Sequence, residues 1–338
     1  MKLFQAINMS SNAVFSRLTS VLPVQDTELY ALYETAMRTF WTFDEVDLVN
    51  DVVQWNENLT DDERNFLSHV LGFFVQADQL VNINLGDRFL KDIEQIPDRY
   101  SKYCRLFYNA QMMIEDVHTL SYETMLNEFI SDPKLNDHFK RSIANIPCVN
   151  QKAQWAARYI NDQESDFPIR LIAFAILEGL FFSGSFASIF WIEQKNLMRG
   201  LVQYNKFISR DEGLHYEFAL TLFRKLRADP DVEFNVDENM IRDMIKEAVL
   251  IETEFINVSI PCAMIGMNVD LMTQYIQYVA DHLLQDIQME PIYKVSNPFD
   301  FMVALGLGDK SNFFEIRSTT YSKPITTGVE YDSDASDF

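Results

Sequence analysis

The sequence contains few of the residues that interrupt helices. Its 338 residues include only 10 glycines and 10 prolines. Apolar residues instead recur at i, i+3, i+4 and i+7 over long stretches, which is the pattern of helices with one buried face. A chain of this length can also bury a sizeable core. The sequence therefore predicts an all-α protein rather than one built from strands and many turns.

Cysteine is scarce as well. The chain has three, Cys104, Cys148 and Cys262, which lie far apart and form no CxxC pair. This spacing excludes a zinc ribbon and a thioredoxin-like motif, and we expect reduced thiols in a cytoplasmic protein. The amino terminus lacks a sustained apolar region after Lys2 and an arginine-rich amphipathic pattern. Neither a signal peptide nor a transit peptide is expected.

Positive charge is also in short supply. Lysine and arginine number 28 against 50 aspartates and glutamates, so the formal net charge is −22. Such a chain repels the phosphates of nucleic acids and the headgroups of anionic lipids. We therefore expect neither nucleic acid nor a membrane as a partner.

Several helices can be located from sequence signals. Thr60 and Glu63 have the spacing of a capping box, which predicts the start of a helix that extends to about residue 90. A second helix is expected over about 99–130, ending before the Asp132-Pro133 pair. Further helices are expected over about 204–226 and after residue 236.

Two of the five histidines follow a glutamate by three residues. These pairs are Glu115 with His118 and Glu212 with His215. Residues at i and i+3 share one helix face, so a carboxylate oxygen and an imidazole nitrogen from one helix can reach the same metal ion. Two such helices supply two halves of a di-metal site.

The remaining carboxylates of such a site come from apolar surroundings. Asp78 lies within LGFFVQADQLV, and Glu178 is the only charged residue of the run at 171–192, LIAFAILEGLFFSGSFASIFWI. Together with Glu115 and Glu212 these acids carry four negative charges, which is costly in a buried site unless protons or cations compensate. Two divalent ions would supply the required +4, as in di-iron and di-manganese helical bundles.

The run at 171–192 has a competing interpretation as a membrane span. Its length fits, and a single central acid costs only about 2.5 to 3.5 kcal/mol on insertion scales. A single span, the absence of a charge bias at its ends and the partner ligands elsewhere favour a buried central helix. We therefore interpret Glu178 as a carboxylate neutralised by metal inside the protein.

Tyr122 is placed to lie beside this site. It follows His118 by four residues and Glu115 by seven, so it shares their helix face. Phe182 and Phe186 follow Glu178 at +4 and +8, and Ile208 precedes Glu212 by four, so these apolar side chains should surround the phenol. A core tyrosine in an ordinary apolar stripe has the same pattern, and spacing alone does not separate the two.

Longer motifs resemble a known family. The segments FWTFDEVDL at 40–48, IEDVHTLSY at 114–122, EGLFFSGSFASIFW at 178–191 and ISRDEGLH at 208–215 are similar to those of the small subunit of class I ribonucleotide reductase, of the eukaryotic and viral type. NPFDFM and NFFE extend the similarity toward the carboxyl end. The resemblance implies a ferritin-like helical bundle with a di-metal carboxylate site in its core.

The resemblance also implies roles for individual residues. The metal ligands would be the six residues already reached by spacing and burial, holding two iron ions per chain, or manganese. Tyr122 would carry a radical, with Trp41, Asp211 and Tyr321 on the electron-transfer route to a partner. The function implied by the resemblance is to generate a tyrosyl radical with O2 and to deliver it to the partner for the reduction of ribonucleotides to deoxyribonucleotides. The metal ligands are Asp78, Glu115, His118, Glu178, Glu212 and His215.

The partner implied by the resemblance is the large catalytic subunit. The large subunit would bind a flexible tail of this chain, residues 317–338, with Phe338 as an apolar anchor. Residues 1–316 would form the helical domain. Tyr331 offers a second aromatic relay beside Tyr321. The resemblance further implies a homodimer in the cytoplasm.

Three other classes of protein fit parts of this pattern. A ferritin-like di-iron oxidase or iron-storage protein uses a similar site but does not explain Tyr122 with its phenylalanines or the aromatic acidic tail. A di-iron oxygenase or desaturase needs a substrate channel, which a sequence does not reveal. A helical scaffold without enzymatic activity would bind no metal.

Overall fold

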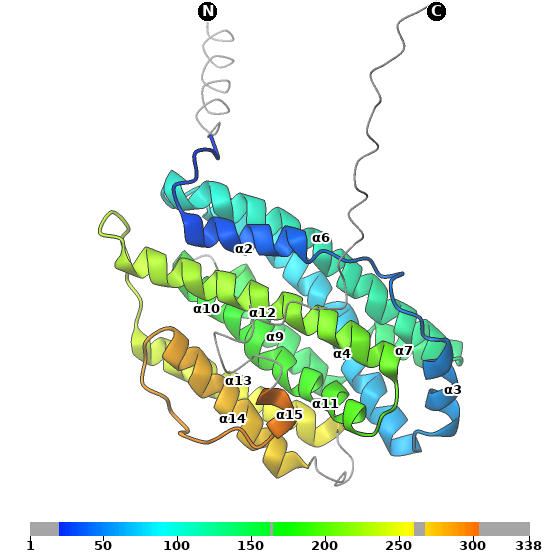
Figure 1. The fold of residues 1–338 in the computed structure, drawn as a ribbon. Coiled ribbons are helices and arrows are strands. Elements are labelled where there is room, and N and C mark those ends of the chain that lie inside the picture. The colour runs from blue at the N-terminus through cyan, green and yellow to red at the C-terminus, as the bar shows by residue number, and fades with distance from the viewer. Residues whose placement is uncertain (1–19, 163–164, 260–267, 304–338) are drawn as a thin grey trace, which may run out of the picture.

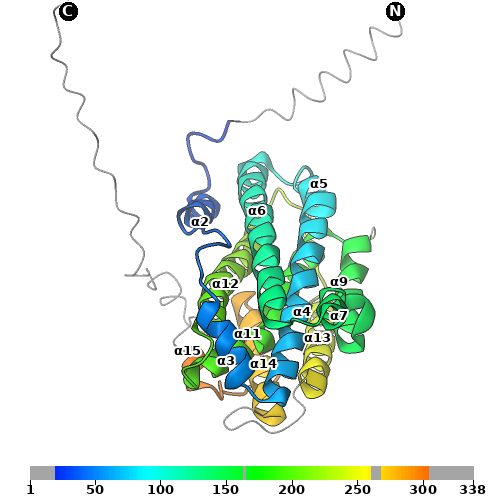
Figure 2. The ribbon, with the colours of Figure 1, turned by 90° about the vertical axis from the view of Figure 1, so that its right-hand side faces the viewer.

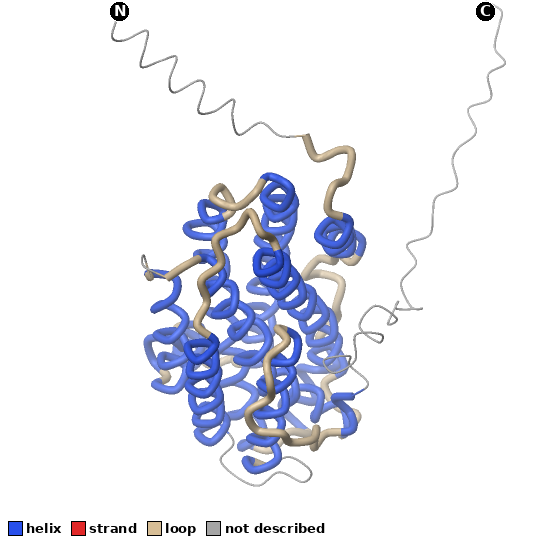
Figure 3. The backbone as a smooth tube through the Cα atoms, turned by 90° about the vertical axis from the view of Figure 1, so that its left-hand side faces the viewer, coloured by secondary structure: helices blue, strands red, loops and turns tan. Residues whose placement is uncertain are grey.

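The computed structural model of the chain describes residues 20–162, 165–259 and 268–303. Within these ranges the secondary structure is helical, and no strand is present (Figure 3). The predicted all-α class is therefore confirmed. The predicted tail at 317–338 lies outside the described residues, as do Tyr321, Tyr331 and Phe338.

The helices are numbered in chain order, and η denotes a π-helical turn. The first half contains α2 Thr27–Arg38, α3 Val49–Glu57, α4 Asp61–Asn84, η1 Leu85–Phe89, α5 Leu90–Asp92, α6 Asp98–Phe129, α7 Pro133–Lys140 and α8 Ser142–Asn145. The second half contains α9 Pro147–Asn161, α10 Phe167–Ala175, η2 Ile176–Phe181, α11 Phe182–Gln194, α12 Arg199–Ala228, α13 Glu238–Ser259, α14 Val269–Asp286 and α15 Asp300–Val303.

The capping box predicted for the helix after residue 60 is present. Thr60 Oγ1 accepts a hydrogen bond from the Glu63 amide at 3.2 Å, and a Glu63 carboxylate oxygen accepts one from the Thr60 amide at 2.9 Å. Both bonds satisfy amides that have no partner within the helix. The other expected helices correspond to α6, α12 and α13, with ends that differ by a few residues from the predicted ones.

The core is built by long helices that pack side by side. α4 packs along α6, and α12 packs against α10, η2 and α11, while α13 lies on α9 and α14 (Figures 1 and 2). α2 covers one side of this bundle, where it contacts both α6 and α12. The elements that carry the predicted metal ligands, α4, α6, η2 and α12, are therefore neighbours around one interior.

The apolar run at 171–192 belongs to a helix buried inside the protein. The continuous stretch Phe167–Gln194 is apolar enough to span a membrane, but 94% of its most hydrophobic window is buried among the other helices. The interpretation as a core helix is thus confirmed. One feature was not predicted: the helix changes to a π-helical turn, η2, at the residues that include Glu178. Single π turns inside α-helices occur frequently at functional sites.

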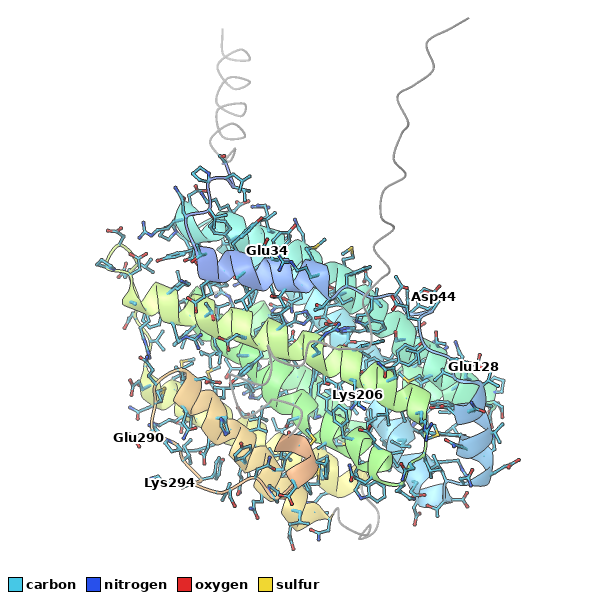
Figure 4. The ribbon with its side chains drawn as sticks, viewed as in Figure 1. Glu34, Asp44, Glu128, Lys206, Glu290 and Lys294 are labelled. Atoms are coloured by element: carbon cyan, nitrogen blue, oxygen red, sulfur yellow. The ribbon has the colours of Figure 1, made fainter. Side chains whose placement is uncertain are left out.

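The surplus of negative charge is carried largely by the surface. Asp44, Glu128 and Glu290 are exposed, and their side chains project from the outside of the bundle (Figure 4). Exposed acids keep their hydration and cost little. The acids that require a physical explanation are those buried between the helices.

Candidate metal centre and tyrosine pocket

Six residues predicted as metal ligands converge in the interior from four elements. Asp78 comes from α4, Glu115 and His118 from α6, Glu178 from η2, and Glu212 and His215 from α12. Each is at most 2% exposed. The Glu-x-x-His spacing places both members of each pair on the inward face of its helix, as the sequence predicted.

The six side chains form two overlapping groups. Ligand atoms of Glu115, Glu178, Glu212 and His215 lie within 4.8 Å of one another, and so do those of Asp78, Glu115 and His118. Glu115 belongs to both groups and therefore joins them.

The imidazoles present the same nitrogen to the carboxylates. His118 Nδ1 lies 3.0 Å from Glu212 Oε1 and 3.3 Å from Glu115 Oε2. His215 Nδ1 lies 3.0 Å from Glu212 Oε2 and also 3.0 Å from Glu115 Oε1. Two carboxylates thus bridge two imidazoles, and all four groups direct possible ligand atoms into one small volume.

Asp78 shows that this volume suits a cation. Both of its carboxylate oxygens are buried and have no hydrogen-bond partner. A buried carboxylate without a partner is strongly disfavoured as an anion. Accordingly, burial and then the nearby charge of Glu115 raise the pKa of Asp78 well above its usual range. A divalent ion would provide the missing partner for both oxygens.

Protons take the place of cations in the metal-free site. Burial, followed by the charge of Glu212, raises the pKa of Glu178 well above its usual range. Burial lowers the pKa of the two imidazoles, but the surrounding carboxylates outweigh it and raise the pKa of both well above normal. Each of these shifts favours the protonated form, so protons can offset negative charge that two divalent ions would offset with +4. The residues present therefore fit a pair of divalent metal ions.

Gln111 is a member of the site that sequence reasoning missed. Its side chain is 1% exposed, and Nε2 lies 3.4 Å from Glu115 Oε1 and 3.3 Å from Glu178 Oε1. The amide thus holds carboxylates from two different elements in a common orientation. It precedes Glu115 by four residues on α6, so its spacing was available as a signal.

Tyr122 lies in an aromatic pocket next to the metal cluster. Its ring is parallel to that of Phe74, which in turn contacts Phe182 and Phe186 with ring centroids 5.3 and 5.0 Å apart. Ile208, the other expected wall residue, is fully buried on α12. Phe74 is thus the ring that touches Tyr122, and Phe182 and Phe186 pack against Phe74.

The phenol of Tyr122 is isolated from hydrogen-bonding groups. Its Oη is buried and has no partner. Burial, followed by the charge of Asp78, raises the pKa of the phenol well above its usual value. Tyr122 is consequently a neutral, protonated phenol in a dry pocket.

A chain of polar contacts links the cluster to Trp41. Trp41 Nε1 donates a hydrogen bond to Asp211 Oδ2 at 2.7 Å, and the same oxygen lies 3.2 Å from His118 Nε2. Arg210 binds the other Asp211 oxygen. Burial would raise the pKa of Asp211, but the charge of Arg210 and the bond to His118 lower it, so the residue is an anion. The structure therefore places two of the residues implied by the resemblance, Trp41 and Asp211, next to a predicted ligand.

A narrow crevice approaches the cluster from the side covered by α2. Gln111, Asp211 and His215 line its inner part, and its volume is about 10 Å³. That is roughly the space that one water molecule requires. The space in this crevice is therefore no larger than one water molecule needs.

Comparison with known proteins gives consistent matches. The family described as "Ribonucleotide reductase, small chain" matches residues 19–298. The chain is 45% identical over 303 residues to the ribonucleoside-diphosphate reductase small chain of Neurospora crassa, which covers 90% of this chain and 71% of that one. It is 43% identical over 303 residues to the small chain of Variola virus, covering 90% and 91%. Among solved structures, the ribonucleotide reductase Rnr4 homodimer from Saccharomyces cerevisiae has a TM-score of 0.74 and 34% identity, covering 85% of this chain and 87% of that one.

Proposed function

This chain belongs to the ribonucleotide reductase small-chain family, and we propose that it forms a tyrosyl radical at Tyr122 and delivers it to a large catalytic subunit. The family match agrees with the resemblance seen in the motifs and with a ferritin-like helical fold, and its named members are subunits of an oxidoreductase. One observation supports the radical chemistry above all: the aromatic pocket of Tyr122 adjoins a buried cluster of four carboxylates and two imidazoles.

The six clustered residues would hold two divalent metal ions, iron by our proposal, with manganese compatible with the same ligands. When bound, such a pair can reduce O2 and supply a one-electron oxidant. Residues of the chain would set the position of that pair. Glu115 and Glu212 lie between both imidazoles, and Gln111 orients Glu115 and Glu178.

Tyr122 would lose one electron from its ring and one proton from Oη, which leaves a neutral radical. A neutral product suits this pocket, because a charged one would be poorly solvated between phenylalanine rings. Among charged groups, Asp78 has the largest effect on the pKa of Tyr122. The Oη proton would therefore leave toward the side of the metal cluster on which Asp78 lies. The rings of Phe74, Phe182 and Phe186 would exclude water and reductants that could quench the radical.

Transfer to the partner would begin at the contact between His118, Asp211 and Trp41. The buried Asp211 anion can accept the proton of the Trp41 indole when the ring is oxidised, because the two are already hydrogen bonded. Tyr321, or Tyr331, would continue the route within the tail at 317–338. That tail would bind the large subunit with Phe338 as its anchor, while residues 1–316 form the helical domain.

We also propose that two copies of this chain form a homodimer in the cytoplasm. The assembly rests on the solved relative, which is a homodimer. The location is supported by the thiols that the structure describes, since Cys104 and Cys148 are free and buried. Cys262 lies outside the described residues. The family assignment favours a reductase subunit over a ferritin-like oxidase or iron-storage protein.

Electron paramagnetic resonance tests this proposal. Metal-free protein is given ferrous iron and O2, and the intact chain is compared with Tyr122→Phe. We expect a tyrosyl signal that the substitution abolishes, while both proteins bind about two iron ions per chain. A signal of unchanged shape in the variant would move the radical to another residue, and absence of iron binding by the intact chain would refute the metal site.

Partner binding needs a separate experiment. A chain truncated after Tyr331 should still form the radical, because the metal cluster and Tyr122 lie in the helical domain. Its nucleotide reduction with the large subunit should be lost. Full activity of the truncated chain would contradict docking through the tail.

A further inference from the structure

A second buried charged group lies outside the metal cluster. Lys152 on α9 and Glu252 on α13 are 1% and 0% exposed, and Lys152 Nζ lies 2.5 Å from Glu252 Oε2. The desolvation of two such charges can exceed their attraction, so a buried ion pair is weak evidence for stabilisation. The other contacts of this pair indicate what it does.

Lys152 binds the backbone of the π turn that carries Glu178. Its Nζ donates a hydrogen bond at 2.9 Å to the carbonyl of Phe181, the last residue of η2 and the third after Glu178. Where a π turn returns to an α-helix the bonding pattern shifts by one residue, so a carbonyl can lose its amide partner. The preceding carbonyl, that of Leu180, accepts a bond from Ser183 Oγ at 2.7 Å.

Glu252 lies against the same junction three residues further along the chain. A Cβ atom added to Gly184 would lie 2.6 Å from Glu252 Oε1, which is closer than real Cβ contacts. The glycine thus allows the carboxylate to touch the first turn of α11. The pair contacts the chain at residue 181 and again at residue 184, directly after the turn that contains a predicted ligand.

Aromatic rings complete the surroundings of the ammonium group. Nζ lies 3.7 Å from the ring centroid of Phe73 and 3.8 Å from that of Phe255, so the cation is held between two π faces. Phe73 also contacts Phe74 and Phe182, with ring centroids 5.4 and 5.7 Å apart. The pair is therefore packed against the wall of the Tyr122 pocket as well as against η2.

We infer that Lys152, held by Glu252, is a positioning residue for the metal centre: its bond to the Phe181 carbonyl fixes the π turn so that Glu178 points into the cluster. This inference rests on the proposed function, since it assigns Glu178 to a metal. Neither Lys152 nor Glu252 is a proposed ligand.

The chain offers a matched pair of double variants. Lys152→Met/Glu252→Met removes the buried pair and replaces it with apolar side chains of similar size, which is often tolerated. Arg158→Met/Glu247→Met removes an ion pair of 2.8 Å that also joins α9 to α13, but whose side chains are 54% and 44% exposed. Each double variant removes one ion pair between α9 and α13, but only the first also removes a hydrogen bond to η2.

Anaerobic titration with Mn²⁺, followed by the resonance signal of the free ion, measures binding without enzyme turnover. We expect the buried-pair variant to bind at least one of two ions about ten-fold more weakly, the size of effect seen when groups that orient metal ligands are removed. The Arg158/Glu247 variant should bind like the intact chain. Equal binding by all three proteins would refute the inference and leave the proposed function standing, whereas no binding by the intact chain would refute both.

Two single substitutions cover the case in which the double variant does not fold. Glu252→Gln keeps an amide oxygen that can accept a hydrogen bond from Lys152, so the ammonium should stay on the Phe181 carbonyl and the Mn²⁺ affinity within about two-fold of the intact chain. Gly184→Ala forces the whole Glu252 carboxylate away from the junction, which should draw Lys152 off the Phe181 carbonyl and weaken binding. Strong loss of affinity in Glu252→Gln with normal affinity in Gly184→Ala would overturn the inference.

Discussion

The rings of Tyr122 and Phe74 lie face to face, with centroids 4.6 Å apart and planes inclined by only 4°. Phe74 comes from α4 and Tyr122 from α6, the two long helices that pack against each other. The stack fixes the phenol beside the metal cluster, while its Oη has no hydrogen-bond partner. The position of Tyr122 is therefore determined by packing, and its hydroxyl contributes nothing to that packing.

This leads to a prediction for stability. Tyr122→Phe should not destabilise the metal-free protein, because a buried hydroxyl without a partner costs about 1 to 3 kcal/mol of desolvation that phenylalanine avoids. We expect the free energy of unfolding, measured with urea, to stay constant or to rise by about 1 kcal/mol.

Tyr103 on the same helix provides the control. It is fully buried, but its hydroxyl accepts a bond from the Gln25 amide at 2.7 Å and donates one to the Val21 carbonyl at 3.3 Å. Tyr103→Phe should lower the free energy of unfolding by about 1 kcal/mol. Equal losses in the two variants would show that the Tyr122 hydroxyl has a stabilising partner.

A second prediction separates two buried aspartates. Asp78 has no hydrogen-bond partner, whereas Asp51 accepts bonds from the Gly200 and Leu201 amides at 3.1 and 2.8 Å. Asp78→Asn should leave the metal-free melting temperature unchanged or higher and should reduce the increase caused by Mn²⁺. Asp51→Asn should lower the metal-free stability by about 1 to 2 kcal/mol, because charge-assisted bonds at a helix start are lost, and should leave the Mn²⁺ effect intact.

Calorimetry with and without Mn²⁺ measures both effects in each variant. An Asp78→Asn protein with a full metal-induced increase would remove Asp78 from the ligand set. A large loss of metal-free stability in the same variant would show that its carboxylate is paired in the protein.

Much of the site could be predicted because its chemistry repeats at helical spacing. Glu-x-x-His pairs and acids in apolar surroundings are local signals, and they identified residues that the fold brings together. Gln111 could have been found in the same way, since it lies one turn before Glu115.

Other features depend on contacts between distant parts of the chain. Trp41 lies in the connection between α2 and α3, and its partner Asp211 is 170 residues away. No periodic pattern relates the two. The π turn at Glu178 is likewise contacted by Lys152 from another helix, through a bond to the Phe181 carbonyl that the run of apolar residues around Glu178 does not encode. The sequence indicated a continuous helix there because side-chain pattern does not report backbone bonding.

A third prediction concerns the link between Trp41 and His118. In Asp211→Asn the amide oxygen can still accept the indole hydrogen bond, but the negative charge between indole and imidazole is lost. We expect the tyrosyl signal to form nearly normally and nucleotide reduction with the large subunit to fall by at least ten-fold. Parallel measurement of both quantities on one preparation checks this. A loss of activity in proportion to the loss of radical would place Asp211 in radical formation instead of transfer.

The final prediction is a pH dependence of the metal-free protein. The pKa of Asp78 and of Glu178 is raised in the folded protein. Ionisation of these two acids therefore destabilises the folded state increasingly as pH rises above their pKa in the unfolded chain, about 4. The pKa of His118 and of His215 is also raised, so the stability they contribute is complete below about pH 6.5 and is lost as pH rises through their folded values.

The two imidazoles therefore lower the stability as pH rises above about 6.5, and the two acids act in the same direction up to their folded pKa values. The pKa of Asp211 and Glu212 is lowered, and those two groups affect stability only under more acidic conditions. The melting temperature of metal-free protein should fall from about pH 6.5 to about pH 8.5, while the stabilisation by Mn²⁺ should grow, because cations displace the protons. Scans in about 0.3 M salt screen the repulsion among surface acids, which would otherwise give the same trend. A metal-free melting temperature that stays level or rises across this range would show that the buried cluster does not hold the extra protons.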